Sequence, residues 1–391
     1  RHADVAQEVS LSGSFWDVTN GGRYDQRPVL TVWLVALGFK LLGVSELAGR
    51  LPLALCGLLT LLAAYWVLRR LTNDFVAAIG ALVLATTPTF LFQSRQLISD
   101  VIYYGSLVAS IGGLAAFLWP SSGRRSIVDL AIGSIGLVIG FLAKGLMLGA
   151  VFPLLSFALA VALSWRTPNR GDGQVWAQAE GPDIEPETTV GQALQASWAK
   201  LVVGVAAAGA VIGALLTKLQ HTSYMLLGGE FRKVAVPATF ETTFKKLGFG
   251  FYPWFALVPI TLALFVLAQR RDPSKRCRIA FTQMLVVVVS TAGYVVASLW
   301  AGYLGQIRYP ALPWLAMGIG LMVYQAWMQK EPVHRLWGVL AVGIILALHQ
   351  DFCMYPQSLA FSHLIGAAKF PIELKIKVAT RVFGLLFAVL V

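Results

Sequence analysis

Residues 127–165 read IVDLAIGSIGLVIGFLAKGLMLGAVFPLLSFALAVALSW and decide the fold class. Only Asp129 and Lys144 are charged in this stretch. A helix of about 20 apolar residues crosses a bilayer. The run is therefore long enough for two crossings, which we place at 127–143 and 145–165. The stretch predicts a pair of transmembrane helices with Lys144 at their junction.

The composition of the whole chain agrees with a membrane protein. Of its 391 residues, 57% are hydrophobic and only 13% are charged, whereas soluble globular proteins are roughly 45–50% apolar and about 25% charged. These proportions exclude a soluble enzyme, a disordered chain and a nucleic-acid-binding module. Further apolar runs predict crossings at 51–68, 75–93, 99–119, 199–217, 248–268, 279–300, 311–328 and 336–350, with a partial crossing near 378.

Basic residues in the short loops define the orientation of the chain. If the chain crosses at each span, five basic clusters fall on one side, which the positive-inside rule makes cytoplasmic. They account for the net charge of +12 without a nucleic-acid partner. The clusters are Arg69 and Arg70; Arg124 and Arg125; Arg166 and Arg170; Arg270, Arg271, Lys275, Arg276 and Arg278; and Lys330 and Arg335.

The sequence therefore predicts an all-α polytopic membrane protein. As a helix, the run 30–44 is about 22 Å long, shorter than the roughly 30 Å hydrocarbon core. It favours a helix lying in the interface, with a short tilted span as the alternative. The acidic, Gly- and Pro-rich stretch 166–197 predicts a flexible cytoplasmic insertion. Because the chain begins at Arg1 and stops within an apolar run at Val391, we interpret it as a fragment lacking both ends.

Five regions follow from these assignments. They are a first external loop with interfacial helices (1–50), transmembrane helices (51–165), the cytoplasmic insertion (166–197), transmembrane helices with an external loop at 218–247 (198–350), and an external segment with the start of a further span (351–391).

Three cations stand at helix ends on the side opposite the basic clusters: Arg95, Lys144 and Arg308. Ionisable groups at membrane depth are costly to bury, so they are candidates for function. Together they can hold a phosphate that belongs to a lipid headgroup. The alternative is that each cation separately extends its charge to the interface.

Several short motifs follow one another along the chain. In this order they resemble glycosyltransferase family 39, the protein mannosyltransferases and lipid A aminoarabinose transferases, over about residues 1–325. The motifs are Tyr24-Asp25-Gln26-Arg27-Pro28, Gly43-Val44-Ser45-Glu46 with Arg50-Leu51-Pro52, Arg95-Gln96-Leu97-Ile98-Ser99-Asp100, Phe141-Leu142-Ala143-Lys144-Gly145, Gly250-Phe251-Tyr252-Pro253-Trp254, and Arg308-Tyr309-Pro310-Ala311-Leu312-Pro313.

The resemblance implies a GT-C-type bundle of transmembrane helices with an interfacial helix after the first external loop. It also implies transfer of a sugar from a polyprenyl-phosphate donor to a protein, lipid or glycan acceptor outside the cytoplasm. Membrane lipids are then further partners. The resemblance also implies that the protein lies in the bacterial inner (plasma) membrane, with its active site facing the periplasm or the exterior. The alternative is a transporter or flippase that moves a charged lipid headgroup without chemistry.

The resemblance also assigns roles to single residues. Arg27 occupies the position of the family's phosphate-contacting Lys, and Lys144 matches a second phosphate contact. Arg308 and Arg232 match further phosphate contacts more loosely. Asp100 matches a family Asp next to the cavity, where it assists catalysis, positions the acceptor or binds a metal. Its alternative role is that of a carboxylate at the start of a helix.

Further residues are predicted to line the cavity: Arg1, His2, Tyr24, Gln26, Arg95 and Tyr309. Gln26 stands where aminoarabinose transferases carry a Glu, which argues against an amino-sugar donor and leaves a neutral hexose or pentose. The family's acidic pair would lie before Arg1. Lys218, Lys233, Lys245 and Lys246 are interpreted as solvated or facing lipid headgroups.

The sequence shows no cofactor-binding motif. The five histidines have no metal-ligand spacing, and three cysteines do not make a disulfide framework or a zinc site. A divalent metal at Asp100 is the one cofactor that the resemblance leaves open.

Overall fold

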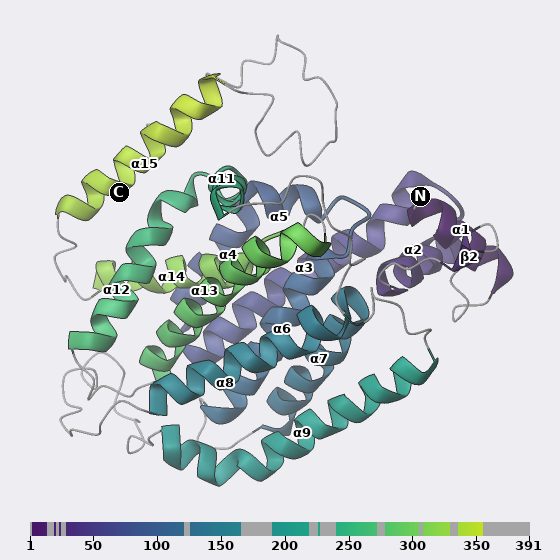
Figure 1. The fold of residues 1–391 in the computed structure, drawn as a ribbon, viewed down its shortest axis with the longest axis horizontal. Helices are drawn as coiled ribbons and strands as arrows, with labels where there is room; N and C mark the ends of the chain where they lie inside the picture. Colours follow the sequence, from purple (N-terminus) through teal and green to yellow (C-terminus); the bar gives the residue numbers. More distant parts are fainter. Residues whose placement is uncertain are drawn as a thin grey trace.

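The computed structural model describes residues 2–13, 19–20, 23–24, 29–120, 126–165, 190–218, 226, 240–271, 278–304, 308–328 and 335–354. In these ranges the chain is helical except for turns and one pair of short strands, β1 (Thr19–Asn20) and β2 (Arg23–Tyr24). The strands pair antiparallel, with Thr19 opposite Tyr24 and Asn20 opposite Arg23. Figure 1 shows a bundle of roughly aligned helices with a smaller helical group at one end.

The smaller group contains the N-terminal helices α1 (His2–Ser12) and α2 (Val29–Leu42), which pack on each other, and α2 packs in turn on α3 (Glu46–Leu71). Helix α2 covers the run for which the sequence predicts an interfacial helix or a short tilted span, and its 14 residues span about 21 Å. It buries Val32 and Val35 against the protein and exposes Leu41 at its end. Gly38 allows the close crossing of α2 and α3, because a side chain there would collide with the carbonyl oxygen of Ala48.

The centre of the bundle is α6 (Asp100–Leu118), most of which is buried. It packs on α3 and, most closely, on α7 (Ile127–Leu146). Small residues allow this approach: a Cβ at Gly113 would meet the backbone of Gly133, and one at Gly136 would meet the backbone of Ser110. Helices in membranes commonly pack through such small residues.

A glycine divides the apolar run that follows α6. Gly145 has φ 76° and ψ 179°, a conformation open to glycine and strained for other residues, and it separates α7 from η1 (Met147–Val151) and α8 (Phe152–Trp165). Beyond the break, Gly149 approaches the backbone of Gly140. The predicted division of this run next to Lys144 is confirmed.

Two predicted crossings have different boundaries in the structure. The run 75–93 is split into α4 (Asp74–Thr86) and α5 (Pro88–Gln93), because Pro88 has no N–H to continue α4 and suits the first position of a new helix. The predicted run 248–268 begins inside the end of α11 (Phe240–Gly250) and continues past a turn into a second helical segment. That segment consists of η2 (Trp254–Leu257) and α12 (Val258–Arg271).

The remaining helices are α9 (Val190–Lys218), α13 (Arg278–Leu304), α14 (Leu312–Met328) and α15 (Arg335–Met354). Because α9 already begins at Val190, the insertion predicted for 166–197 ends by residue 189. Helix α14 packs chiefly on α4. The partial crossing predicted near 378 lies outside the described residues.

In the described part of the chain, five segments are long and apolar enough to cross a membrane. They are Glu46–Leu71, Asp100–Leu118, Ile127–Ser164, Ser197–Lys218 and Arg278–Leu299. Helix α3 turns leucines such as Leu55, Leu58, Leu59 and Leu62 outward, as expected of a surface in contact with lipid. The predicted polytopic membrane fold is confirmed.

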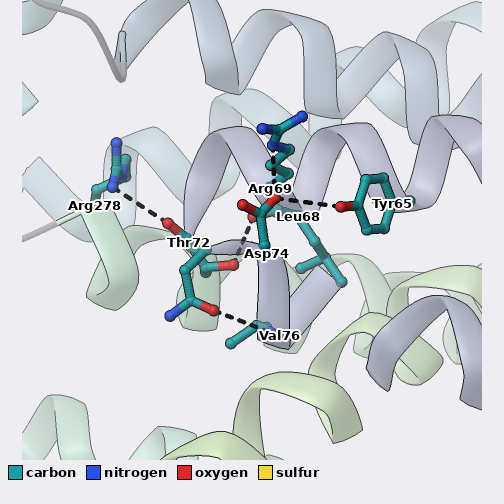
Figure 2. A network of polar contacts seen from close by, with 8 residues as sticks. Tyr65, Leu68, Arg69, Thr72, Asp74, Val76 and Arg278 are labelled. Atoms are coloured by element: carbon teal, nitrogen blue, oxygen red, sulfur yellow. Dashed lines mark hydrogen bonds and ion pairs between the residues drawn. The ribbon is translucent and has the colours of Figure 1, made fainter. Parts of the chain in front are cut away.

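The basic residues at the α3–α4 turn form a network, which Figure 2 shows. The carboxylate of Asp74 lies 2.6 Å from Arg69 Nε and accepts a hydrogen bond of 3.2 Å from the hydroxyl of Tyr65. Arg278, at the start of α13, donates to the carbonyl oxygen of Thr72 over 3.5 Å. The network joins the turn to α13.

A second contact joins the same end to α7, because Arg70 Nη2 lies 3.4 Å from Asp129 Oδ1. Three basic residues that the sequence assigned to the cytoplasm, Arg69, Arg70 and Arg278, therefore gather at one end of the bundle. The positive-inside rule makes this end cytoplasmic. The start of α6 and the end of α7 lie at the opposite end.

Candidate active site

Three side chains from separate parts of the sequence meet at the extracytoplasmic end of the bundle. Asp100 is the first residue of α6, Lys144 lies in the last turn of α7, and Arg308 precedes α14. The helix dipoles favour these positions, since a helix N-terminus stabilises a carboxylate and a C-terminus stabilises a cation. We call this group the Asp100 triad.

The Asp100 triad is held by two ion pairs. Lys144 Nζ lies 2.7 Å from Asp100 Oδ1, and Arg308 Nε lies 3.5 Å from Asp100 Oδ2. The side chains of Asp100, Lys144 and Arg308 are 12%, 14% and 29% exposed. The carboxylate is therefore both a first-turn helix residue and the centre of a partly buried charge cluster.

The charges of the Asp100 triad do not balance, because one carboxylate faces two cations. In addition, Nη1 of Arg308 is buried and has no hydrogen-bond partner. Excess charge in a low-dielectric environment is costly unless a counter-ion is bound. The triad is therefore suited to holding an anion, as the sequence predicted for Lys144 and Arg308.

Buried tyrosines fix the helices around the triad. The hydroxyl of Tyr103 donates to the carbonyl oxygen of Leu148 over 2.8 Å, which ties α6 to the segment after Gly145. The hydroxyl of Tyr309 donates to the carbonyl oxygen of Ser290 over 2.9 Å, which ties the residue after Arg308 to α13. Burial raises the pKa of Tyr309, so this hydroxyl remains a donor.

Lys246 is a cation near the site that sequence reasoning assigned to solvent or headgroups. Its helix α11 buries Thr243, Leu247 and Gly250, and Lys246 lies beside this buried face, itself half-buried. Burial and then the positive charge of nearby Arg308 lower the pKa of Lys246. The spacing of Thr243, Leu247 and Gly250 predicts one buried helix face, and it could have indicated that Lys246 lies beside buried residues.

The other predicted site residues are only partly visible. Arg95 lies in the turn between α5 and α6 and forms no ion pair within the described part of the chain. His2 belongs to α1 and Tyr24 to β2, but their side chains are not described. Outside the described residues lie Arg1, Gln26, Arg27 and Arg232.

Among the described residues, no three His, Cys, Asp or Glu side chains gather closely enough to hold a metal ion. Cys56 is a free thiol. The divalent metal considered at Asp100 therefore stays a prediction.

Comparisons with known proteins agree with this architecture. Residues 26–170 match the family model described as dolichyl-phosphate-mannose-protein mannosyltransferase. An uncharacterized protein of Aquifex aeolicus is 32% identical over 120 residues, which are 30% of this chain and 23% of that protein. The undecaprenyl phosphate-alpha-4-amino-4-deoxy-L-arabinose arabinosyl transferase 2 of Pseudomonas fluorescens is 29% identical over 157 residues, which are 38% of this chain and 26% of the relative. The matches thus span about a quarter of these relatives.

Among solved structures, ArnT from Cupriavidus metallidurans has a similar fold in its apo state and when bound to undecaprenyl phosphate. The TM-scores are 0.62 and 0.63, with 15% and 16% sequence identity, and the match covers 100% of this chain and 64% of ArnT. The fold is therefore that of the GT-C class of integral membrane proteins. Within this class the chain is similar, over part of its length, to the protein mannosyltransferases and aminoarabinose transferases that its motifs resemble. The comparisons also support the predicted location in the bacterial inner membrane.

Proposed function

We propose that this chain carries the membrane-embedded site of a glycosyltransferase that takes its sugar from a polyprenyl-phosphate-linked donor and transfers it outside the cytoplasm. The observation that carries the proposal is the Asp100 triad, with two cations around one carboxylate at the extracytoplasmic end of the bundle. The chain is similar to an undecaprenyl phosphate arabinosyl transferase and to ArnT, which binds undecaprenyl phosphate. This similarity supports a lipid phosphate as the anion.

The position of the triad suits a lipid substrate. Asp100 and Lys144 stand at the ends of α6 and α7, so the site lies where a bilayer places its headgroups. A phosphate bound there leaves its isoprenoid chain in the hydrocarbon region. This arrangement allows an insoluble donor to reach the site without leaving the membrane.

The cations contribute to the chemistry of transfer. An acceptor oxygen forms a bond to the anomeric carbon of the sugar, while the bond from that carbon to the phosphate oxygen breaks. The electron pair of the broken bond stays on the phosphate, whose negative charge increases in the transition state. Lys144 and Arg308 are fixed in advance, so they stabilise this charge without reorganisation.

Asp100 acts in this proposal as a positioning residue. Its Oδ1 is engaged by Lys144 and its Oδ2 by Arg308. Two cations next to a carboxylate favour its ionised form, which makes it a weaker base. We therefore assign Asp100 to holding the two cations in place, and the acceptor proton goes to another base.

The experiment measures release of polyprenyl phosphate by the full-length protein. Purified protein is incubated with undecaprenyl phosphate carrying a radiolabelled sugar, in the presence of membrane extract as a source of acceptor. Lys144→Ala and Arg308→Ala should each reduce release by at least about 100-fold, comparable to the loss of one transition-state donor. Lys200→Ala, which changes an exposed lysine of α9, is the matched control and should keep full activity.

Full activity in Lys144→Ala and Arg308→Ala would remove the proposed phosphate site. Binding of the donor without release, together with its movement across a vesicle membrane, would show a carrier instead of an enzyme.

A further inference from the structure

Helix α11, which carries Lys246, lies beside α5 at the extracytoplasmic end of the bundle (Figure 1). At the start of α11, the carbonyl oxygen of Phe240 accepts a hydrogen bond of 2.6 Å from the hydroxyl of Tyr294 on α13. At its end, a side chain at Gly250 would collide with Oγ1 of Thr89 on α5. Contacts with α13 and α5 therefore hold the two ends of α11, and the backbone of Lys246 is fixed between them.

The same face of α13 also holds the residue after Arg308. Ser290 lies one helical turn before Tyr294, and its carbonyl oxygen accepts the hydrogen bond from Tyr309. Because only one turn separates the two attachment points, α13 brings α11 close to Arg308. The effect of Arg308 on the pKa of Lys246 shows that the two charges interact.

Lys246 adds a cation to the surroundings of the Asp100 triad. Its side chain is half-buried, and it forms no ion pair within the part of the chain that the structure describes. The triad has one positive charge in excess, and Lys246 raises this excess to two among the described side chains. Cations close to one another disfavour each other's charged form, and a bound anion relieves this repulsion. The site therefore has sufficient positive charge to hold an anion with two negative charges.

The lipid phosphate has a different charge before and after transfer of the sugar. While it is attached to the sugar, the phosphate is a diester with one negative charge. After transfer it is a monoester, and such a phosphate has a second pKa of about 6 and thus close to two negative charges at neutral pH. The charge of the Asp100 triad alone matches the diester, whereas the charge of the triad together with Lys246 matches the monoester.

We infer that Lys246 is a further phosphate-binding cation, which contacts the negative charge that the phosphate gains as the sugar leaves. The inference rests on the proposed function, because it concerns the phosphate held by Lys144 and Arg308. It gives the site a preference for the monoester over the diester. An interaction that strengthens as this charge develops stabilises the transition state more than the bound donor, so it accelerates transfer.

The test compares two lipids that differ in this one charge: undecaprenyl phosphate and its methyl ester, a diester. Binding of each lipid to the full-length protein is measured by native mass spectrometry. Lys246→Met keeps an unbranched side chain and removes the charge. It should bind undecaprenyl phosphate about tenfold more weakly, as expected for the loss of one charge-assisted hydrogen bond, and bind the methyl ester nearly as the wild type does. Lys246→Arg should keep the preference of the wild type for the monoester.

Lys40→Met is the matched control. Lys40 is an exposed lysine in the last turn of α2, on the same side of the membrane, and its replacement should leave the binding of both lipids unchanged. Thermal unfolding without lipid gives a second measurement. Lys246→Met should unfold at the temperature of the wild type or above it, because the repulsion by Arg308 is removed.

Three results for Lys246→Met would overturn the inference. Equal losses of affinity for the two lipids would show that the lysine does not distinguish the second charge. Wild-type affinity for both lipids would show that it does not contact the phosphate. A lower unfolding temperature without lipid would show that the lysine serves folding.

Lys144→Ala separates failure of the inference from failure of the proposed function. If Lys144→Ala weakens the binding of both lipids and Lys246→Met changes neither, only the inference is wrong. If Lys144→Ala binds both lipids as the wild type does, the proposed phosphate site is wrong, and the inference is wrong with it.

Discussion

Replacing Asp100 by Asn removes one negative charge while keeping the shape of the side chain, so the effect on stability reports the ion pairs. At an effective dielectric constant near 20, charges about 3–4 Å apart attract by about 4–6 kcal/mol before desolvation is counted. Breaking one partner of a buried pair costs about 3–5 kcal/mol net. Because Asp100 contacts both cations and is 12% exposed, we expect Asp100→Asn to lose about this amount.

The assay is thermal unfolding of purified full-length protein in detergent, followed by tryptophan fluorescence. A loss of this size should lower the unfolding temperature by roughly 5–10 °C. Undecaprenyl phosphate should raise the unfolding temperature of Asp100→Asn by more than it raises that of the wild type, because its phosphate supplies the missing anion. The control is Asp74→Asn, which breaks the exposed pair with Arg69 at the cytoplasmic end and should cost at most about 1 kcal/mol. Equal effects of the two substitutions would refute the reasoning.

Two further predictions concern the surroundings of the triad. Gly145→Ala should lower stability by about 1–2 kcal/mol and weaken undecaprenyl phosphate binding, because alanine is strained at φ 76° and Lys144 is the preceding residue; Gly343→Ala, in open space on α15, is the control in the same unfolding and binding assays. The lowered pKa of Lys246 means that this lysine loses its charge at a lower pH than an exposed lysine, so lipid affinity should fall as pH rises through that range. Lys246→Arg stays charged and should keep its affinity there, and identical pH profiles would exclude a contribution of Lys246 to binding.

The sequence was sufficient to predict the membrane fold and to place Lys144 and Arg308 at the same end of the bundle, where both contact Asp100. Both cations stand next to short motifs, and the basic loops assign them to one side of the membrane. The motifs and the basic loops thus place these two residues, which are distant in sequence, on the same side of the membrane. Neither feature shows a contact between them.

The contacts of Gln93 and Lys246 could not be predicted in the same way. Gln93 falls in an apolar run that hydropathy assigns to a single crossing, and only the break at Pro88 turns it toward Tyr104, with which its side chain forms a hydrogen bond. Lys246 lies in a helix whose buried face depends on packing against α13 and η2. In both cases the role of the side chain depends on tertiary neighbours. The signals in the sequence, a proline and a short helical period, indicated local structure only.

The close packing of α6 on α7 has a consequence for how the site can move. Asp100 and Lys144 sit on two helices whose backbones touch through glycines, so their separation is fixed within one rigid unit. Arg308 precedes α14, which packs chiefly on α4. A rearrangement between these two units would lengthen or shorten the Asp100–Arg308 contact and leave the Asp100–Lys144 contact intact. Arg308 is thus the cation of the site that can change its position, whereas Lys144 stays fixed relative to Asp100.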